Sequence, residues 1–202
     1  MAALRVARTV TGRDKGLTFA GDYHGMFDEV LIKSAKSRDG VPGATPIAPG
    51  IPRESVANMI VMDYGTPETL DWIRANVDDL AAIMVEPFQS RRPHFKPIEW
   101  LKEVREITRK SGAALIFDEV VTAFRVGPGG AQGYLNVRPD LTVFGKIVSG
   151  GFPMAGGVGG REDIMSCVAA GVKAGKKRAY VGGTLTANPL SCAAGYYAIE
   201  EI

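Results

Sequence analysis

The sequence contains little of what builds a disulfide framework, a metal site or a membrane span. It has two cysteines and two histidines among 202 residues. Cys167 and Cys192 lack paired spacing, which fits a reducing compartment and predicts a cytoplasmic protein. With only His24 and His94 present, a histidine metal cluster is not expected. The apolar runs are too short for a bilayer span or a signal peptide, so we expect no membrane partner.

Charge of one sign is not in excess either. The sequence carries 24 Lys and Arg against 22 Asp and Glu, a formal net charge of +2. So weak a field predicts no nucleic-acid partner and leaves small molecules as the expected partners. There is no repeat, low-complexity tract or convincing domain boundary, and a chain of this length can form one domain with a substantial core.

The middle of the chain alternates short apolar runs with an amphipathic stretch. We predict buried strands at 81–85 and 113–117, and between them a helix at 97–112 that begins at Pro97 and stops at Gly112. Strand, helix and strand in this order build parallel sheets. The predicted fold class is therefore α/β, with a mostly parallel central sheet covered by helices. Residues 33–54, rich in proline and glycine, are predicted to be a loop.

Three apolar runs end abruptly in charge, at Glu86, Asp118 and Lys146. In open α/β sheets ligands bind at the carboxyl ends of the strands, so a carboxylate and an amine are expected at one edge. Nucleotide motifs do not explain this pattern, because Lys146 is followed by Ile147 rather than Ser or Thr, and residues 150–160 contain no G-x-G-x-x-G register.

A lysine and an aspartate at neighbouring strand ends suit one cofactor in particular. A lysine that forms a Schiff base with a pyridoxal cofactor needs a carboxylate to pair with the protonated pyridine nitrogen. Taken singly, Lys146 is more often a solvated lysine and Asp118 a turn or cap residue. Taken together, they support the hypothesis of a pyridoxal site, with Gly145, Gly150 and Gly151 expected to leave space for the cofactor.

Three stretches resemble a known family. They are "LIFDEVVTAFR", "GGAQGYLNVRPDLTVFGKIVSGGFPMAGGVGG" and "GGTLTANPLSCAAG", and they are similar to the class III aminotransferases. These are pyridoxal-phosphate enzymes of fold type I, and the likeness is greatest to the branch containing glutamate semialdehyde aminomutase. The resemblance covers almost the whole chain. It implies a transaminase that moves an amino group between an amine donor and a carbonyl acceptor.

The resemblance implies a role for each of five residues. Lys146 would hold the cofactor as a Schiff base and shuttle a proton as the catalytic residue. Asp118 would pair with the pyridine nitrogen, and Val120 would pack on one face of the ring. Tyr23 would stack on the other face. Thr184 would reach the cofactor phosphate of the opposite subunit, which implies a homodimer with shared active sites.

Ordinary structural interpretations remain open for the same residues. Tyr23 fits a half-buried turn, Val120 fits a core position, and Thr184 fits a hydroxyl that caps the helix after it. Glu86, whose counterpart in the family lies near the cofactor, suits a structural ion pair equally well. A non-catalytic α/β binding module is the alternative outside the enzyme class.

Residues 88–95 depart from the family pattern by carrying two arginines, Arg91 and Arg92, in a loop on the substrate side. They are either solvated, or they clamp a substrate carboxylate or a phosphopantetheine arm. The stretch resembles aminotransferase domains of polyketide and peptide synthetases, which aminate a carrier-bound keto acyl group. Intramolecular transfer of the aminomutase type is the further alternative.

Both ends of the sequence look cut. The first residues already have helical spacing without a cap, and the last stretch ends without a stop signal. In the family a phosphate-binding loop precedes this region and a small C-terminal domain follows it. Residues 1–202 are therefore expected to be a partial large domain, truncated at both ends and without the small domain. Alone, they are expected to bind pyridoxal phosphate poorly in an absorption titration.

Overall fold

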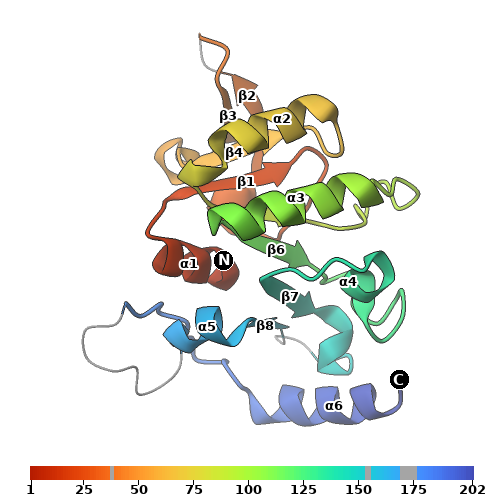
Figure 1. The fold of residues 1–202 in the computed structure, drawn as a ribbon. Helices are drawn as coiled ribbons and strands as arrows, with labels where there is room; N and C mark the ends of the chain where they lie inside the picture. The colour runs from red at the N-terminus through yellow and green to blue at the C-terminus, as the bar shows by residue number, and fades with distance from the viewer. Residues whose placement is uncertain (37–38, 153–155, 169–176) are drawn as a thin grey trace.

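The computed structural model describes residues 1–36, 39–152, 156–168 and 177–202. A central sheet of six strands runs through it (Figure 1). The strand order is β4 (Met59–Met62), β1 (Lys15–Phe19), β5 (Leu80–Val85), β6 (Ala114–Asp118), β7 (Leu141–Gly145) and β8 (Gly156–Gly160). Every pairing among the first five is parallel, and β8 alone pairs antiparallel to β7. The predicted α/β class with a mostly parallel sheet is confirmed.

Helices cover both faces of this sheet. One face packs against α2 (Pro67–Asn76) and α3 (Ile98–Ser111), and the other packs against α1 (Ala2–Thr11) and α5 (Glu162–Met165) (Figure 1). Alternate residues of β5 enter the two cores: Ile83 and Val85 lie on the first side, Ala82 and Met84 on the second. The strand is buried on both faces, which explains its continuous apolar sequence.

The remaining helical elements are short, apart from one helix near the C-terminus. They are α4 (Gly130–Leu135), α6 (Pro189–Glu200) and the 3-10 turns η1 (Asp28–Val30), η2 (Glu54–Val56), η3 (Val77–Asp79), η4 (Lys146–Ser149) and η5 (Ser166–Val168). Within the described residues, no helix has the length and apolar content to cross a membrane.

The predicted strand–helix–strand unit is present. Each of its boundaries lies within one residue of the predicted position. The helix begins after Pro97 and ends at Gly112, whose φ of 76° lies in the left-handed region that favours glycine. The first strand begins at Leu80, and the second extends to Asp118. Turn chemistry at the helix ends therefore set these boundaries as the sequence indicated.

The loop predicted at 33–54 is wrong for its first half. β2 (Ile32–Lys36) pairs antiparallel with β3 (Pro42–Pro46) in a separate two-stranded sheet. Pro42 and Pro46 occupy the two ends of β3, and a strand of a two-stranded sheet tolerates residues without an N–H there. The proline and glycine content therefore led to a loop being predicted where a hairpin packs beside β4.

Candidate active site

Four neighbouring parallel strands end at one edge of the sheet. Four of the residues that the sequence pointed to as site residues lie at or just after these strand ends. Tyr23 comes after β1, Glu86 directly after β5, and Lys146 directly after β7, while Asp118 is the last residue of β6. The sequence separates these residues widely, but the parallel order β1-β5-β6-β7 brings them to the same edge. This edge is where α/β sheets bind ligands.

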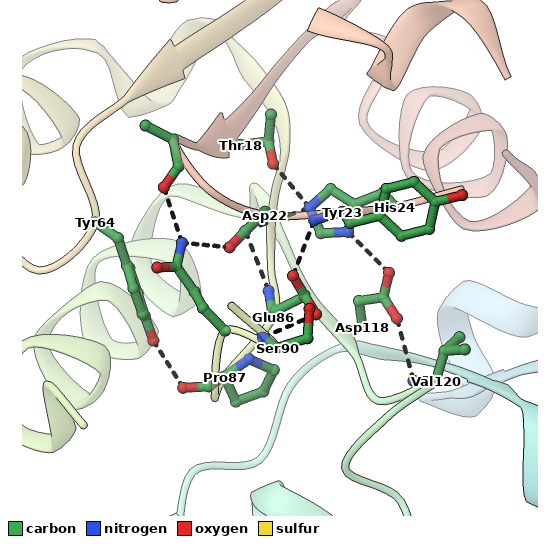
Figure 2. Close-up of polar contacts among 12 residues, drawn as sticks. Thr18, Asp22, Tyr23, His24, Tyr64, Glu86, Pro87, Ser90, Asp118 and Val120 are labelled. Atoms are coloured by element: carbon green, nitrogen blue, oxygen red, sulfur yellow. Dashed lines mark hydrogen bonds and ion pairs between the residues drawn. The ribbon is translucent and has the colours of Figure 1, made fainter. Parts of the chain in front are cut away.

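Asp118 is held by a buried histidine. Its Oδ2 lies 2.8 Å from His24 Nδ1, and its Oδ1 accepts a hydrogen bond from Val120 N at 3.1 Å. On its other side, His24 Nε2 lies 2.8 Å from Thr18 Oγ1 and 3.3 Å from Asp22 Oδ2, so His24 sits between the two aspartates (Figure 2). Burial lowers the His24 pKa, but the hydrogen bonds to Asp118 and Asp22 outweigh it and raise the pKa to about 9.

Glu86 fixes the backbone that carries Tyr23. Its Oε2 accepts a hydrogen bond from Tyr23 N at 2.8 Å, and its own N–H donates to Asp22 Oδ2 at 3.2 Å (Figure 2). Burial raises the Glu86 pKa. Within the part of the chain that the structure describes, Glu86 makes hydrogen bonds and no ion pair.

Val120 and Tyr23 present apolar surface at this edge. The Val120 side chain lies against Gly145, where a Cβ would come within 3.1 Å of Val120 Cγ1. Gly145 has extended backbone, so its lack of a side chain matters for space rather than for conformation. The Tyr23 side chain is 49% exposed and available to cover a ligand. Val120 is thus part of the site edge rather than of the deep core.

Lys146 begins η4 with an unusual backbone. Its φ of 52° is in the left-handed region, which costs free energy for a residue other than glycine. In the β6–β7 register Asp118 lies opposite Val143, three residues before Lys146. That offset corresponds to about 10 Å along the strand. The donor set, a carboxylate at one strand end and an amine at the next, suits a cofactor with a pyridine nitrogen at one end and a carbonyl carbon at the other.

Thr184 lies in an exposed turn before α6 and outside this group. The helix cap is Asn188, whose side chain accepts hydrogen bonds from Leu190 N and Ser191 N, so the capping interpretation of Thr184 is wrong. Among the described residues, no hydrogen bond joins Thr184 to Asp118 or Lys146. Thr184 is exposed.

Gly150, one of the three glycines that flank Lys146, has a structural reason that does not involve a ligand. A Cβ on Gly150 would overlap the carbonyl oxygen of Ala194 in α6, and a Cβ on Gly195 would overlap the carbonyl oxygen of Val148 in η4. These close approaches hold α6 against the segment that begins with Lys146. Gly151 has open space beside it. Gly150 therefore has a packing role, and space for the cofactor beside it stays a prediction.

The two arginines of the 88–95 loop differ. Arg92 donates to Gln89 Oε1 from Nε at 2.9 Å and from Nη2 at 2.6 Å, and Gln89 Nε2 donates to Asp22 Oδ1 at 2.6 Å. Arg91 makes no ion pair within the described ranges and lines a pocket of about 230 Å³ beside the β2–β3 hairpin. Arg92 is therefore part of the network behind His24, and only Arg91 is available to bind a further group.

The sequence did not predict a role in the site for His24, Asp22 or Gln89. The signal was present in "GDYH", because an acid and a histidine directly follow a buried strand at the ligand edge. No local pattern gives the 94-residue separation between His24 and Asp118. The contact depends on β5 lying between β1 and β6.

An α/β sheet with an aspartate and a lysine at adjacent strand ends is the framework that the sequence resemblance implied. The family model for class III aminotransferases matches residues 1–202. The chain is 41% identical to glutamate-1-semialdehyde 2,1-aminomutase 1 of Macrococcus caseolyticus, over all of the chain and 46% of that protein. It spans about half the length of the curated relatives that it matches.

Solved structures agree. An omega-transaminase from Sphaerobacter thermophilus superposes with a TM-score of 0.87 at 38% identity, over 98% of this chain and 46% of the other. A transaminase with bound PLP superposes with a TM-score of 0.85 at 34% identity, over 99% and 46%. The chain belongs to the class III aminotransferases, a pyridoxal-phosphate-dependent family of fold type I.

Proposed function

We propose that this chain is the lysine-bearing part of the large domain of a pyridoxal-phosphate-dependent transaminase, which moves an amino group from an amine donor to a carbonyl acceptor. One observation carries the proposal. Asp118 and Lys146 stand at the ends of adjacent parallel strands, and Asp118 is backed by a histidine whose pKa is raised to about 9. The Asp118 carboxylate is thus prepared to receive a cationic ring nitrogen.

The residues of the chain divide the binding work. Asp118 would keep the proton on the pyridine nitrogen of bound pyridoxal phosphate, while Tyr23 and Val120 would pack on the two faces of its ring. Bound pyridoxal phosphate supplies an electron sink for negative charge that develops at the substrate α-carbon. The Lys146 amine would hold the cofactor at its carbonyl carbon; once a substrate amine has displaced it there, the freed Lys146 amine would take the α-proton and return it. His24 balances the Asp118 charge and fixes its orientation through the 2.8 Å contact.

We also propose that the protein is a cytoplasmic homodimer in which Thr184 contacts the cofactor phosphate of the partner's site. The exposed position of Thr184 supports this assignment. Gly150 and Gly195 support it further, because they pack η4 against α6 and so couple the Lys146 segment to the helix that follows Thr184. Cys167 and Cys192 both carry free thiols, which supports the compartment.

Intramolecular transfer is the second candidate, because curated relatives named glutamate-1-semialdehyde 2,1-aminomutase are 41% and 42% identical to the chain. An aminomutase retains the intermediate that a transaminase releases as a keto product. Supplying an amine donor without an acceptor and measuring free keto product separates the two. A carrier-bound acceptor is a further alternative, and its arginine clamp now depends on Arg91 alone.

Borohydride reduction of the full-length protein with pyridoxal phosphate, followed by peptide mapping, tests the proposal. We expect a label on Lys146, and we expect Lys146→Met to lower kcat by about 10²- to 10⁴-fold, the range for a lost acid–base group. Lys33→Met, which alters an exposed hairpin lysine, is the control and should leave both readouts unchanged. A holoprotein that turns over without a label on Lys146 would contradict the assignment.

A further inference from the structure

Glu119 lies between Asp118 and Val120 and is fully buried, with 0% of its surface exposed. Its carboxylate accepts four hydrogen bonds. Oε2 accepts from Thr122 Oγ1 at 2.9 Å and from Ala131 N at 2.6 Å, and Oε1 accepts from Gln132 N at 3.1 Å and from Gln132 Nε2 at 3.0 Å. The chemistry proposed above does not use Glu119, yet burying a carboxylate is costly unless it is fully paired.

The Glu119 network continues to the strand that carries Lys146. Gln132 Nε2 also donates to Thr142 Oγ1 at 3.2 Å, and Thr142 belongs to β7. In the backbone, Glu119 N donates to Val143 O at 2.9 Å. The end of β6 is therefore joined to β7 twice, once through the backbone and once through a side-chain bridge from Glu119 to Gln132 to Thr142. We call this side-chain bridge the β6–β7 clamp.

At the end of β6, the side chains of Glu119 and Asp118 point in different directions. The Glu119 side chain enters α4, whereas the side chain of the preceding Asp118 turns to His24. Gly130 allows this approach. Its φ is 61°, and a Cβ there would overlap Glu119 Oε2. The glycine at the first position of α4 is thus explained by the Glu119 carboxylate.

We propose that Glu119 is a positioning residue that holds Asp118 and Val120 at a fixed separation from Lys146 through the β6–β7 clamp. This inference rests on the proposed function, because it gives that separation its purpose. Adjacent strands that shift by a fraction of a residue would move the carboxylate relative to the amine, and small misplacements of reacting groups have large kinetic effects. In this proposal Asp118 supplies the negative charge for the ring nitrogen, and Glu119 fixes the position of Asp118 relative to Lys146.

The side chain has to be an acid rather than an amide. All of the groups that face the carboxylate donate hydrogen bonds, and two of them are the backbone N–H groups of Ala131 and Gln132. In Glu119→Gln, the new NH2 group would face one of these donors in either orientation of the amide. This substitution preserves volume while it breaks the clamp, so it separates positioning from simple filling of space.

A matched pair of substitutions isolates the positioning role. Thr122 and Thr142 are both 5% exposed, and each has one hydroxyl contact in the network. Thr122→Val removes a contact to Glu119 that does not reach β7, whereas Thr142→Val removes the side-chain connection to β7 and leaves the backbone bond to Val143 in place. Both variants should lose similar thermal stability. Only Thr142→Val should loosen the strand pair.

The first readout is amide hydrogen exchange in the cofactor-free full-length protein. In Thr142→Val, exchange at the Glu119 and Val120 amides should rise about tenfold, the equivalent of one hydrogen bond, and Thr122→Val should leave it within about twofold of wild type. Equal exchange in the two variants would overturn the proposal. This readout also decides the case if Glu119→Gln does not fold.

The second readout uses the cofactor-loaded protein. Glu119→Gln should lower kcat by about 100-fold with little change in KM, and it should alter the visible circular dichroism of the bound cofactor. An unchanged dichroism band together with unchanged kcat would also overturn the proposal. Failure of the proposed function looks different, because wild type itself would then show no borohydride label on Lys146.

Discussion

The two ends of the central sheet each bury an aspartate, and they neutralise it in different ways. Asp140 directly precedes β7 at the amino edge and is 3% exposed; Asp118 ends β6 at the carboxyl edge and is 8% exposed. Asp140 accepts from Arg105 Nη1 at 2.6 Å and from Arg161 Nη1 at 2.9 Å. Asp118 has a histidine where Asp140 has two arginines.

The difference separates a structural carboxylate from a functional one. Arginine does not lose its proton at any pH at which proteins fold, so the charge of Asp140 is permanently balanced. Its third bond, from Leu115 N at 2.9 Å, fixes it between β6 and β7. Histidine does titrate, so the charge around Asp118 depends on pH and on what binds beside it. At the amino ends of the strands, the charge of Asp140 is therefore balanced at every pH. At the carboxyl ends, the charge beside Asp118 can change.

The largest expected effect comes from breaking the amino-edge pair. Asp140→Asn leaves Arg105 cationic and mostly buried, and it should lower the free energy of unfolding by about 3 kcal/mol. Asp118→Asn is the matched substitution. It should cost about 1 kcal/mol, because His24 can release its proton when the carboxylate is lost. Urea unfolding of both variants measures the contrast, which disappears if Asp118→Asn costs as much as Asp140→Asn.

The parts of the fold that the sequence predicted well are those that local chemistry determines. Residues 81–117 form strand, helix and strand close to the predicted bounds, because two-sided burial makes β5 and β6 apolar throughout and Gly112 ends the helix. The hairpin at β2 and β3 was missed because its register comes from pairing across the turn rather than from any apolar pattern.

The site residues at the strand ends could be predicted from the sequence. The contacts that hold those residues in place could not. Glu86, Asp118 and Lys146 each follow an apolar run, and a parallel sheet places such residues at one edge. The partner of Asp118 was not predictable, because strand order alone decides that β1 delivers His24 to it. The sequence likewise does not show that Arg92 bonds to Gln89 while Arg91 does not, because this depends on where the buried Gln89 side chain lies.

The titration of His24 gives the next effect in size. Its pKa in the folded protein, about 9, lies above its ordinary value of 6.5, so the protonated form stabilises the fold. This stabilisation is complete below about pH 6.5 and is lost as the pH rises through about 9. We expect a loss of about 2 kcal/mol across that window.

Urea unfolding at several pH values measures this loss, and two substitutions assign it. His24→Gln should flatten the profile between pH 6.5 and 9. His94→Gln removes the other histidine, which is exposed, and should leave the profile as in wild type. A wild-type profile that is already flat in this window would show that the carboxyl edge is as fixed as the amino edge.

The smallest effect tests how far the fixed part of the carboxyl edge extends. Arg92→Gln breaks two hydrogen bonds to Gln89, whose side chain is 0% exposed, and should cost about 1 kcal/mol. Arg91→Gln, one residue earlier in the same loop, should change the free energy of unfolding by less than about 0.5 kcal/mol. If the two variants unfold alike, Arg92 does not support the Asp22–His24 contact. If they differ as expected, the loop contains one arginine that braces the site, as Arg105 braces the opposite edge, and one that remains available to a ligand.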